Sequence, residues 1–171
     1  MSSRYIQVYT GSGKGKTTAA LGLAMRVVGG GKKVCMIQFM KGQKSGEIET
    51  IDKIPDFEVY QFGRKEFVDK NKPSTIDIQL AEQGLKKAEE VINSGRYDLV
   101  ILDEIIVAIN FQLLKLDKVM NVIKSGKNID IVLTGRDTPE EIIDVADLVT
   151  EMKEIKHPYK EDKKSRRGID Y

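Results

Sequence analysis

Short apolar runs alternate along the chain with longer segments in which apolar residues recur every three or four positions. The clearest run, Lys33–Phe39 (KVCMIQF), is almost wholly apolar, which is typical of a strand buried on both faces of a sheet. Phe57–Phe62 (FEVYQF) is the weakest strand candidate. The pattern predicts strands at Tyr5–Tyr9, Lys33–Phe39, Phe57–Phe62, Asp98–Glu104, Ile129–Gly135 and Asp147–Met152.

Helical periodicity predicts helices between these strands. They run from Thr17 to about Val28, from Ser74 to about Ser94 and from Asp117 to Lys124, and a fourth begins near Thr138. Gly29–Gly31 is expected to end the first helix, and Ser74 and Asp117 are expected to cap the second and third. In the fourth, Thr138 and Glu141 have the spacing of a capping box, and the proline between them suits the first helical position.

The alternation of strands and helices predicts βαβ units and therefore a mainly parallel sheet. Right-handed crossovers place helices on both faces of such a sheet. We therefore predict an α/β fold with a mainly parallel central sheet, in a single domain spanning residues 1–171. Residues 40–53 and 63–73 lack a clear period, as does the tail at 153–171, and such segments are usually functional or mobile.

The composition narrows the class of protein. A net charge of +2 gives no argument for nucleic-acid binding, and no apolar run approaches the length of a membrane span. The first residues contain no apolar signal-peptide core, so we expect a cytoplasmic protein. Cys35 is the only cysteine and His157 the only histidine, which argues against disulfides and against the usual zinc sites. We expect Cys35 to be a small core residue.

A glycine- and lysine-rich loop follows the first predicted strand. Its sequence VYTGSGKGKTTAALG nearly matches the phosphate-loop pattern G-x-x-x-x-G-K-[ST]. Gly15, Lys16 and Thr17 fit the end of the pattern, but Thr10 occupies the position of the first glycine, which has moved to Gly11. A glycine-rich turn without a ligand is the alternative, and the strand before and helix after the loop argue against it.

The chemistry of this loop predicts a bound polyphosphate. Its glycines allow several backbone N–H groups to converge on one anion, and the following helix adds the positive end of its dipole. Lys16 supplies a positive charge, and the Thr17 hydroxyl suits a Mg²⁺ ligand. The predicted nucleotide-binding residues are Thr10, Gly11, Ser12, Gly13, Lys14, Gly15, Lys16, Thr17 and Thr18.

A second motif, which is acidic, supports a metal ion at this loop. The apolar run LVILDE ends in Asp103 and Glu104, which would lie at the carboxyl edge of the sheet beside the loop. Either carboxylate could reach Mg²⁺ directly or through water, with Thr17 as a further ligand. Taken alone, Asp103 and Glu104 could equally cap the next helix. The two motifs together predict a magnesium–nucleotide domain but not its reaction, because a phosphotransferase or a motor protein has the same motifs.

Ordered motifs over nearly the whole chain identify a family resemblance. They are TGSGKGKTTAALG (Thr10–Gly22), QFMKG (Gln38–Gly42), GE (Gly46–Glu47), LDE (Leu102–Glu104), LTGR (Leu133–Arg136), ADLVTEM (Ala146–Met152), KH (Lys156–His157) and GIDY (Gly168–Tyr171). In this order they resemble the ATP:corrinoid adenosyltransferases of the cob(I)yrinic acid a,c-diamide type, including the displaced glycine. The resemblance implies a RecA-like P-loop fold, a homodimer and a flavoprotein as the class of reductant.

The resemblance also implies a reaction. In this family the Co(I) of a corrinoid attacks the 5′ carbon of ATP, and triphosphate is the leaving group. The triphosphate lies in the loop in the reverse sense from ordinary NTPases, so Lys16, Thr17 and Glu104 would act with Mg²⁺ on the leaving group. Cobalt is itself the nucleophile, so no protein acid or base is required. The product would serve adenosylcobalamin synthesis or salvage.

The corrinoid side of the site departs from the family pattern. The family uses aromatic residues after the third strand, often Gly-Phe-x-Trp, to displace the lower axial ligand of cobalt. This chain has no tryptophan and contains FGRKEFV (Phe62–Val68), in which Phe67 is the best candidate. Alternatively, Phe67 packs the loop onto the core, as we expect of Phe62. Some members carry an N-terminal lid, and here the chain starts a few residues before the first strand.

Three further features have two interpretations each. Arg136 follows a predicted strand and could hold a phosphate or the partner subunit, or form a surface salt bridge. His157 is expected to be structural rather than a cobalt ligand. The basic tail could close over the corrinoid or stay solvated. The rival functions are a P-loop phosphotransferase or NTPase, and a nucleotide-dependent nucleic-acid-binding module.

Overall fold

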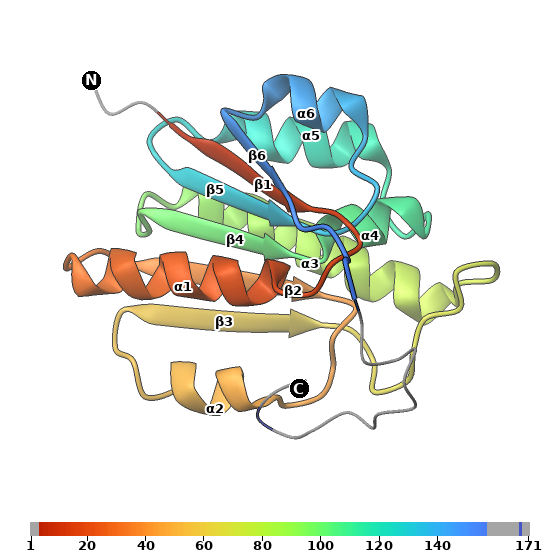
Figure 1. Ribbon diagram of the computed structural model, residues 1–171, viewed down its shortest axis with the longest axis horizontal. Coiled ribbons are helices and arrows are strands. Elements are labelled where there is room, and N and C mark those ends of the chain that lie inside the picture. The colour runs from red at the N-terminus through yellow and green to blue at the C-terminus, as the bar shows by residue number, and fades with distance from the viewer. Residues whose placement is uncertain (1–3, 157–167, 169–171) are drawn as a thin grey trace.

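Six parallel strands form one sheet, whose strand order is β3-β2-β4-β5-β1-β6 (Figure 1). The computed structural model describes residues 4–156 and 168. The strands are β1 (Ile6–Thr10), β2 (Val34–Phe39), β3 (Phe57–Phe62), β4 (Leu99–Asp103), β5 (Asp130–Thr134) and β6 (Leu148–Glu151). This arrangement confirms the predicted α/β class and the parallel sheet. His157 and most of the predicted tail lie outside the described residues.

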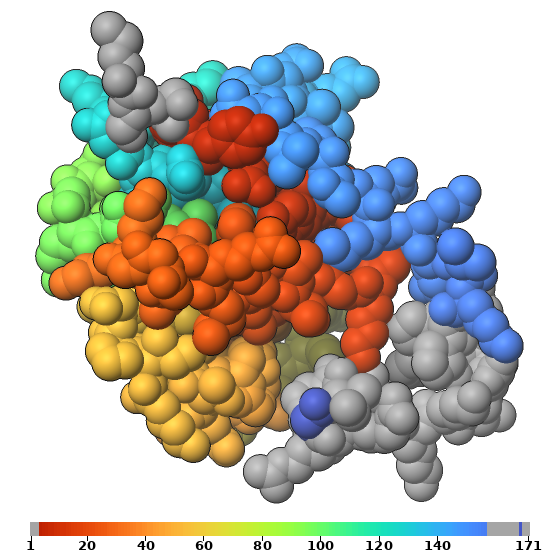
Figure 2. Space-filling model, turned by 60° about the vertical axis from the view of Figure 1, so that its left-hand side comes forward, coloured from red at the N-terminus to blue at the C-terminus, as the bar shows by residue number. Residues whose placement is uncertain are grey.

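Helices cover both faces of the sheet. They are α1 (Lys16–Gly29), α2 (Gly46–Ile51), α3 (Thr75–Asn93), α4 (Ile105–Asn110), α5 (Leu116–Ser125) and α6 (Glu140–Val145). Residues of α1 and α2 pack in one apolar cluster with one face of the strands, while α3, α4, α5 and α6 contribute to the cluster on the other face. In Figure 2, the side chains of α1, in orange, form the middle of the face of the molecule that is turned toward the viewer.

The core explains the apolar runs. Every residue of β2 and of β4 is buried, because alternate side chains enter the two apolar clusters on opposite faces. Cys35 is a core residue as predicted, and its burial raises the pKa of the thiol to about 12. β3 lies at one edge of the sheet and β6 at the other, where the residues of β6 are exposed.

The helix termini confirm one predicted cap and correct two. Ser74 accepts a hydrogen bond from the backbone N–H of Asp77 and so caps α3 as expected, and Asp77 completes a capping box that was not predicted. α5 begins one residue before Asp117, which therefore lies in its first turn, where a negative charge still favours the helix dipole. The capping box predicted at Thr138 is wrong, because α6 begins only at Glu140 and the Thr138 hydroxyl instead bonds to that of Thr10 at 2.7 Å.

Two short helices, α2 and α4, were not predicted. Each has six residues, which is fewer than two turns and too short to establish a helical period in the sequence. α2 lies in the segment 40–53 that had no clear period. In the portion of the chain that the structure describes, no helix combines the length and the apolar character needed to cross a membrane.

Candidate active site

The glycine-rich loop joins β1 to α1 at the carboxyl edge of the sheet. Gly11 and Gly15 have φ values of 100° and 115°, a conformation that favours glycine over any residue with a side chain. α1 begins at Lys16 with no side-chain cap at its N-terminus. The first N–H groups of a 14-residue helix therefore face the loop without a capping side chain, which suits an anionic ligand.

The position of Thr10 explains the displaced glycine of the motif. Thr10 still belongs to β1 and pairs with Glu151 of β6, so it has ordinary strand geometry and needs no glycine. The chain turns only at Gly11, where an added Cβ would lie 2.5 Å from the carbonyl oxygen of Met152. The close approach of the segment after β6 therefore requires a glycine at position 11 rather than at position 10.

The segment after β6 also binds the loop. Gly13 donates its N–H to the Met152 carbonyl at 2.6 Å, and Met152 donates its own N–H to the Thr10 carbonyl at 2.8 Å. Figures 1 and 2 show this segment, in blue, beside the red loop. The N–H of Gly13 thus has a protein acceptor in this structure, unlike the inward-pointing N–H groups that the sequence predicted around the anion.

Lys16 lies across the loop and is almost completely buried. Its side-chain amine donates to the carbonyl oxygens of Gly11 and Gly13, both at 2.7 Å. Burial lowers the pKa of Lys16, and the nearby Arg136 lowers it further. An ammonium group has three N–H donors, so one remains for a phosphate oxygen once the two carbonyls are satisfied.

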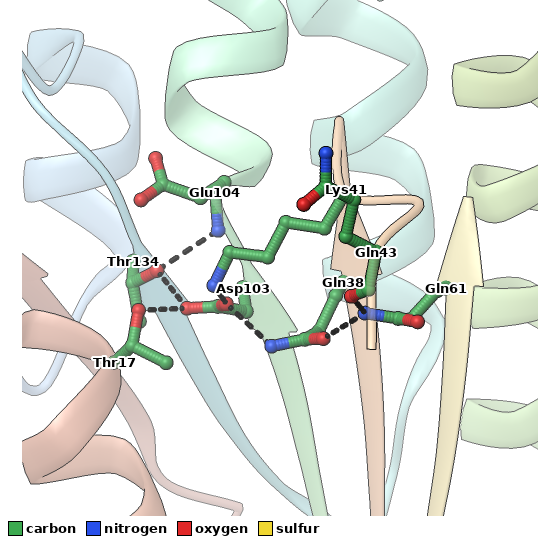
Figure 3. A network of polar contacts seen from close by, with 8 residues as sticks. All are labelled: Thr17, Gln38, Lys41, Gln43, Gln61, Asp103, Glu104 and Thr134. Atoms are coloured by element: carbon green, nitrogen blue, oxygen red, sulfur yellow. Dashed lines mark hydrogen bonds and ion pairs between the residues drawn. The ribbon is translucent and has the colours of Figure 1, made fainter. Parts of the chain in front are cut away.

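Asp103 is the centre of a buried network at the end of β4 (Figure 3). Its Oδ1 accepts hydrogen bonds from the hydroxyls of Thr17 and Thr134, both at 2.8 Å. Its Oδ2 accepts from Gln38 Nε2 at 3.2 Å and from Lys41 Nζ at 2.7 Å. Because a carboxylate can only accept, the Thr17 hydroxyl donates its proton to Asp103, and its lone pairs remain available for a cation.

Glu104 differs from Asp103 in its hydrogen bonding. Its backbone has a φ of 63°, and its N–H donates to the Thr134 hydroxyl at 2.9 Å. Its carboxylate points away from the network (Figure 3), and no residue of the described chain donates a hydrogen bond to it. Burial and then the charge of Asp103 raise the pKa of Glu104. Glu104 thus has the carboxylate that is free to accept a cation.

Three members of this network were not assigned a role from the sequence: Gln38, Lys41 and Thr134. Gln38 and Lys41 belong to the QFMKG motif, and Thr134 belongs to LTGR, so the motifs marked their importance without indicating their partners. Burial acts to lower the pKa of Lys41, but the charge and hydrogen bond of Asp103 outweigh it and raise the pKa overall. Lys41 therefore remains the positive partner of Asp103.

The network extends to the loops after β2 and β3. Gln61 Nε2 donates to Gln38 Oε1 and to the Gln43 carbonyl, both at 3.0 Å. Gln43 Nε2 donates in turn to the Lys65 carbonyl at 2.9 Å. The two loops also touch at Gly42 and Gly63, where an added Cβ on either glycine would collide with the backbone of the other loop. The loop after β3 is therefore fixed against the loop that carries Lys41.

A second anchor holds the loop after β3 to α3. Arg64 binds Asp77 through two parallel hydrogen bonds, Nε to Oδ1 at 2.8 Å and Nη2 to Oδ2 at 3.0 Å. Asp77 also accepts from the backbone N–H of Ser74 in the capping box. One buried carboxylate thus holds both the start of α3 and the start of the loop that presents Phe67.

Replacing Asp77 with asparagine is expected to lower the free energy of unfolding at pH 7 by about 2 kcal/mol, because charge-assisted hydrogen bonds are lost. The Arg64 guanidinium is the main cause that lowers the pKa of Asp77 from 3.8 to about 2. The pKa of Asp77 is lower in the folded than in the unfolded protein. Its contribution to folding stability is therefore complete at pH values well above 3.8 and is lost as the pH falls toward 2.

Urea denaturation of both proteins from about pH 2 to about pH 7, a range that includes the interval between the folded and unfolded pKa values of Asp77, tests this prediction. The difference in unfolding free energy should narrow at the acid end. Asp144→Asn, an exposed substitution on α6, should change stability by less than about 0.5 kcal/mol at any of these pH values. A difference for Asp77→Asn that does not vary with pH would contradict the assignment.

Phe67 and Arg136 lie in different surroundings. Phe67 is fully exposed, with a relative exposure of 103%, so the interpretation that it packs the loop onto the core is wrong. Phe62, by contrast, packs against the core as expected.

The backbone carbonyl of Arg136 accepts a hydrogen bond from Asn110 at 2.7 Å. The exposed guanidinium of Arg136 pairs with no carboxylate within residues 4–156 and 168.

The donors around Thr17 fit a Mg²⁺ ion that is held jointly with a nucleotide. Among the residues the structure describes, no group of three histidine, cysteine, aspartate or glutamate side chains is arranged to hold a metal alone. Mg²⁺ usually takes only one or two protein carboxylates and completes its shell with phosphates and water. Thr17 and Glu104, with Asp103 behind Thr17, provide such a partial set.

Comparisons with known proteins identify the family of the chain. A family model described as ATP:corrinoid adenosyltransferase BtuR/CobO/CobP matches residues 2–171. A protein of Sinorhizobium sp named corrinoid adenosyltransferase is 37% identical over 171 residues, covering 97% of this chain and 79% of the relative. Proteins of the same name are 34% identical in Pseudomonas aeruginosa (96% of this chain, 82% of the relative) and 33% identical in Escherichia coli K12 (97% and 85%).

Proposed function

The chain belongs to the ATP:corrinoid adenosyltransferase family, and from this premise we propose how its residues transfer the 5′-deoxyadenosyl group of ATP to a corrinoid. The family match over residues 2–171 is the observation that carries the activity. In the transfer, the electron pair of Co(I) forms the bond to C5′, and the C5′–O bond breaks with its electron pair passing to triphosphate. The protein is a transferase that acts in adenosylcobalamin synthesis.

The glycine-rich loop binds the leaving triphosphate. The remaining N–H donor of Lys16 and the uncapped first turn of α1 would stabilise the negative charge that develops as the C5′–O bond breaks. Donors that are already oriented stabilise such charge without reorganisation. Arg136 lies close enough to lower the pKa of Lys16, and it is a second cation available to the phosphates.

Thr17 and Glu104 would hold Mg²⁺ beside the triphosphate, and Asp103 positions Thr17 by accepting its hydroxyl proton. When bound, Mg²⁺ supplies positive charge that stabilises the departing phosphate oxygens. Lys41 and Gln38 keep Asp103 paired in its buried position, where an unpaired charge would be costly. The different hydrogen bonding of the two carboxylates supports different roles for them in this proposal.

Phe67 contacts the corrinoid in this proposal. An exposed phenylalanine on a loop that is anchored at both Gly63 and Arg64 has no packing role in the described chain, and it lies on the carboxyl side of β3, as the family pattern requires. Orientation of the two substrates then accounts for the rest of the rate enhancement, because Co(I) is itself the nucleophile and needs no general base.

Replacing Phe67 with alanine is expected to raise the KM for the corrinoid about tenfold, while the KM for ATP changes less than about twofold, because apolar contact with only one substrate is lost. Steady-state kinetics with each substrate varied in turn measures both constants. Ile76→Ala, which also truncates an exposed apolar side chain (55% exposed), is the matched control and should change neither constant. Equal effects of both variants would contradict the role of Phe67.

One assay tests the proposed function against its rivals. The protein is incubated with ATP, Mg²⁺ and a chemically reduced corrinoid, and the products are separated. A Co–C bonded adenosylcorrinoid and triphosphate in equal amounts are expected. Release of phosphate or diphosphate without a Co–C bond would identify a phosphotransferase or NTPase and overturn the proposal.

The family resemblance also supports a homodimer and a flavoprotein reductant for this chain. Light scattering after size-exclusion chromatography should give twice the mass of the 19.2 kDa chain. A monomer at assay concentrations would contradict the dimer, and the transfer assay with chemical reductant does not depend on the flavoprotein.

A further inference from the structure

The turn after β5, residues 135–138, carries Arg136 and lies directly on α4 at the carboxyl ends of the strands (Figure 1). We call it the Arg136 turn. An added Cβ on Gly135 would lie 2.5 Å from the Cβ of Ile106, so no side chain fits between the turn and the helix. The same helix begins immediately after Glu104, the proposed metal ligand. α4 therefore joins the Arg136 turn to the carboxylate of the proposed metal site.

Asn110, the last residue of α4, holds the Arg136 turn through its side chain. Its Nδ2 donates to the carbonyl oxygen of Arg136 at 2.7 Å and to that of Asp137 at 3.1 Å. The two hydrogens of a side-chain amide permit one bond to each carbonyl. Ile106, against which Gly135 packs, precedes Asn110 by one helical turn, so both contacts lie on the same face of α4.

The two ends of the Arg136 turn are anchored separately. The Gly135 N–H donates to the Tyr9 carbonyl at 3.2 Å. The Thr138 hydroxyl bonds to the hydroxyl of Thr10 at 2.7 Å. Between these ends, Asp137 has a φ of 51°, a left-handed conformation that residues with a side chain disfavour. The amide on α4 therefore supports the strained middle of the turn, where the guanidinium is attached.

The guanidinium of Arg136 is the group that this turn positions. Burial lowers the pKa of Lys16 and the charge of Arg136 lowers it further, so the guanidinium lies within electrostatic reach of the phosphate loop. Burial raises the pKa of Glu104, and the charge of Arg136 is among those that oppose this rise. Since a long exposed side chain loses rotamer freedom when it binds, a fixed backbone beneath it lowers the entropic cost of reaching a phosphate.

Resting on the proposed function, we propose that Asn110 is a positioning residue for the triphosphate, because it fixes the backbone from which Arg136 reaches the phosphates. Asn110 makes no contact with the triphosphate itself, since both of its N–H groups are bound to the turn. The alternative is a purely structural role, in which the amide stabilises the fold without acting through Arg136. The two roles differ in the effect of Asn110 that remains once Arg136 is removed.

The test measures the binding of inorganic tripolyphosphate with Mg²⁺ to the full-length protein by titration calorimetry, which requires neither a corrinoid nor transfer. Arg136→Ala should weaken binding about fivefold, the upper end for an exposed charge pair. Asn110→Ala should weaken it about threefold, because the guanidinium must then be ordered on binding. The double variant should bind roughly fivefold rather than about fifteenfold more weakly than the wild type, since both changes remove the same interaction.

A second variant and a matched control complete the test. Asn110→Leu keeps a similar side-chain volume without a donor, and it should match Asn110→Ala, so that a cavity cannot account for the loss. Asn93 is likewise the last residue of its helix, α3, and its Nδ2 also donates to two oxygens, those of Glu89 and Ser125. Asn93→Ala should leave the affinity for tripolyphosphate unchanged.

Three results would overturn the positioning role. They are unchanged affinity in both Asn110 variants, unchanged affinity in Arg136→Ala, and losses that multiply in the double variant. The last of these would show that the amide acts independently of the guanidinium.

The transfer assay separates this inference from the proposed function. With ATP and a reduced corrinoid, Asn110→Ala should lower kcat about threefold and change the KM for the corrinoid less than about twofold, because only the triphosphate end is affected. If tripolyphosphate binding follows the expected pattern but no Co–C bond forms, the proposed reaction fails and the positioning role stands. If transfer proceeds and the binding pattern is absent, the positioning role fails and the reaction stands.

Discussion

Replacing Lys16 with alanine is expected to lower kcat by roughly 10²–10³-fold, the cost of removing one donor that stabilises charge in a transition state. Lys16 is held by the Gly11 and Gly13 carbonyls, which leave one N–H for the triphosphate. Because that charge appears only as the C5′–O bond breaks, the effect should fall on kcat more than on the KM for ATP. Initial rates of adenosylcorrinoid formation measure the loss.

Two companion variants separate the lost charge from a damaged loop. Lys16→Met keeps most of the aliphatic stem in its buried position and should lose as much activity as the alanine variant. Lys14→Ala removes an exposed positive charge from the same loop and should cost less than about tenfold. Circular dichroism should show all three folded. Near-normal turnover of a folded Lys16→Ala protein would show that the loop does not stabilise the leaving group.

Replacing Glu104 with glutamine is expected to lower kcat about 10²-fold and to raise the Mg²⁺ concentration needed for half-maximal rate. The carboxylate of Glu104 accepts no hydrogen bond in the described chain, whereas Asp103 already accepts four. A glutamine of the same shape keeps the backbone geometry but removes the negative charge. Rates at fixed ATP over a Mg²⁺ titration give the half-saturating concentration.

Asp103→Asn is the informative comparison, because it alters the residue that positions Thr17. It should lower the free energy of unfolding, since Lys41 loses its buried partner, and should shift the Mg²⁺ dependence less than Glu104→Gln does. A larger shift of the Mg²⁺ dependence for Asp103→Asn would reverse the two assignments and make Asp103 the direct ligand.

The roles of Thr134, Gln38 and Lys41 depend on which strands are neighbours. β5 lies between β1 and β4, so the Thr134 hydroxyl reaches both Asp103 and the N–H of Glu104. β2 lies on the other side of β4 in a register that pairs Gln38 with Asp103. Strand order arises from contacts between segments far apart in the chain, and no local pattern of residues encodes it.

The failed capping box at Thr138 shows the same limit. The spacing of Thr138 and Glu141 is correct for a cap, but a hydroxyl bonds to whichever partner the fold brings near. Here that partner is the hydroxyl of Thr10, on the strand that precedes the phosphate loop. At Ser74 the predicted cap does form, because the Ser74 hydroxyl accepts from the backbone N–H of Asp77 and no distant residue replaces that bond.

The sequence by itself determined the features that depend on neighbouring residues. Buried strands, long helices and the loop before Lys16 follow from apolar periodicity and from the backbone freedom of glycine, which act over a few residues. The parallel class then placed Lys16, Asp103 and Glu104 at one edge, because parallel strands end on the same side. The ordered motifs added the family, which the comparisons confirmed.

The contacts between these residues depend on the tertiary structure. Among the described residues, four donors bind Asp103 and none binds Glu104, and Phe67 is exposed rather than packed. The tertiary structure also explained the displaced glycine, since a Cβ at position 11 would collide with the Met152 carbonyl, while Thr10 keeps ordinary strand geometry. Each of these results depends on the packing of distant segments, which minimises unpaired buried charge and steric overlap across the whole fold.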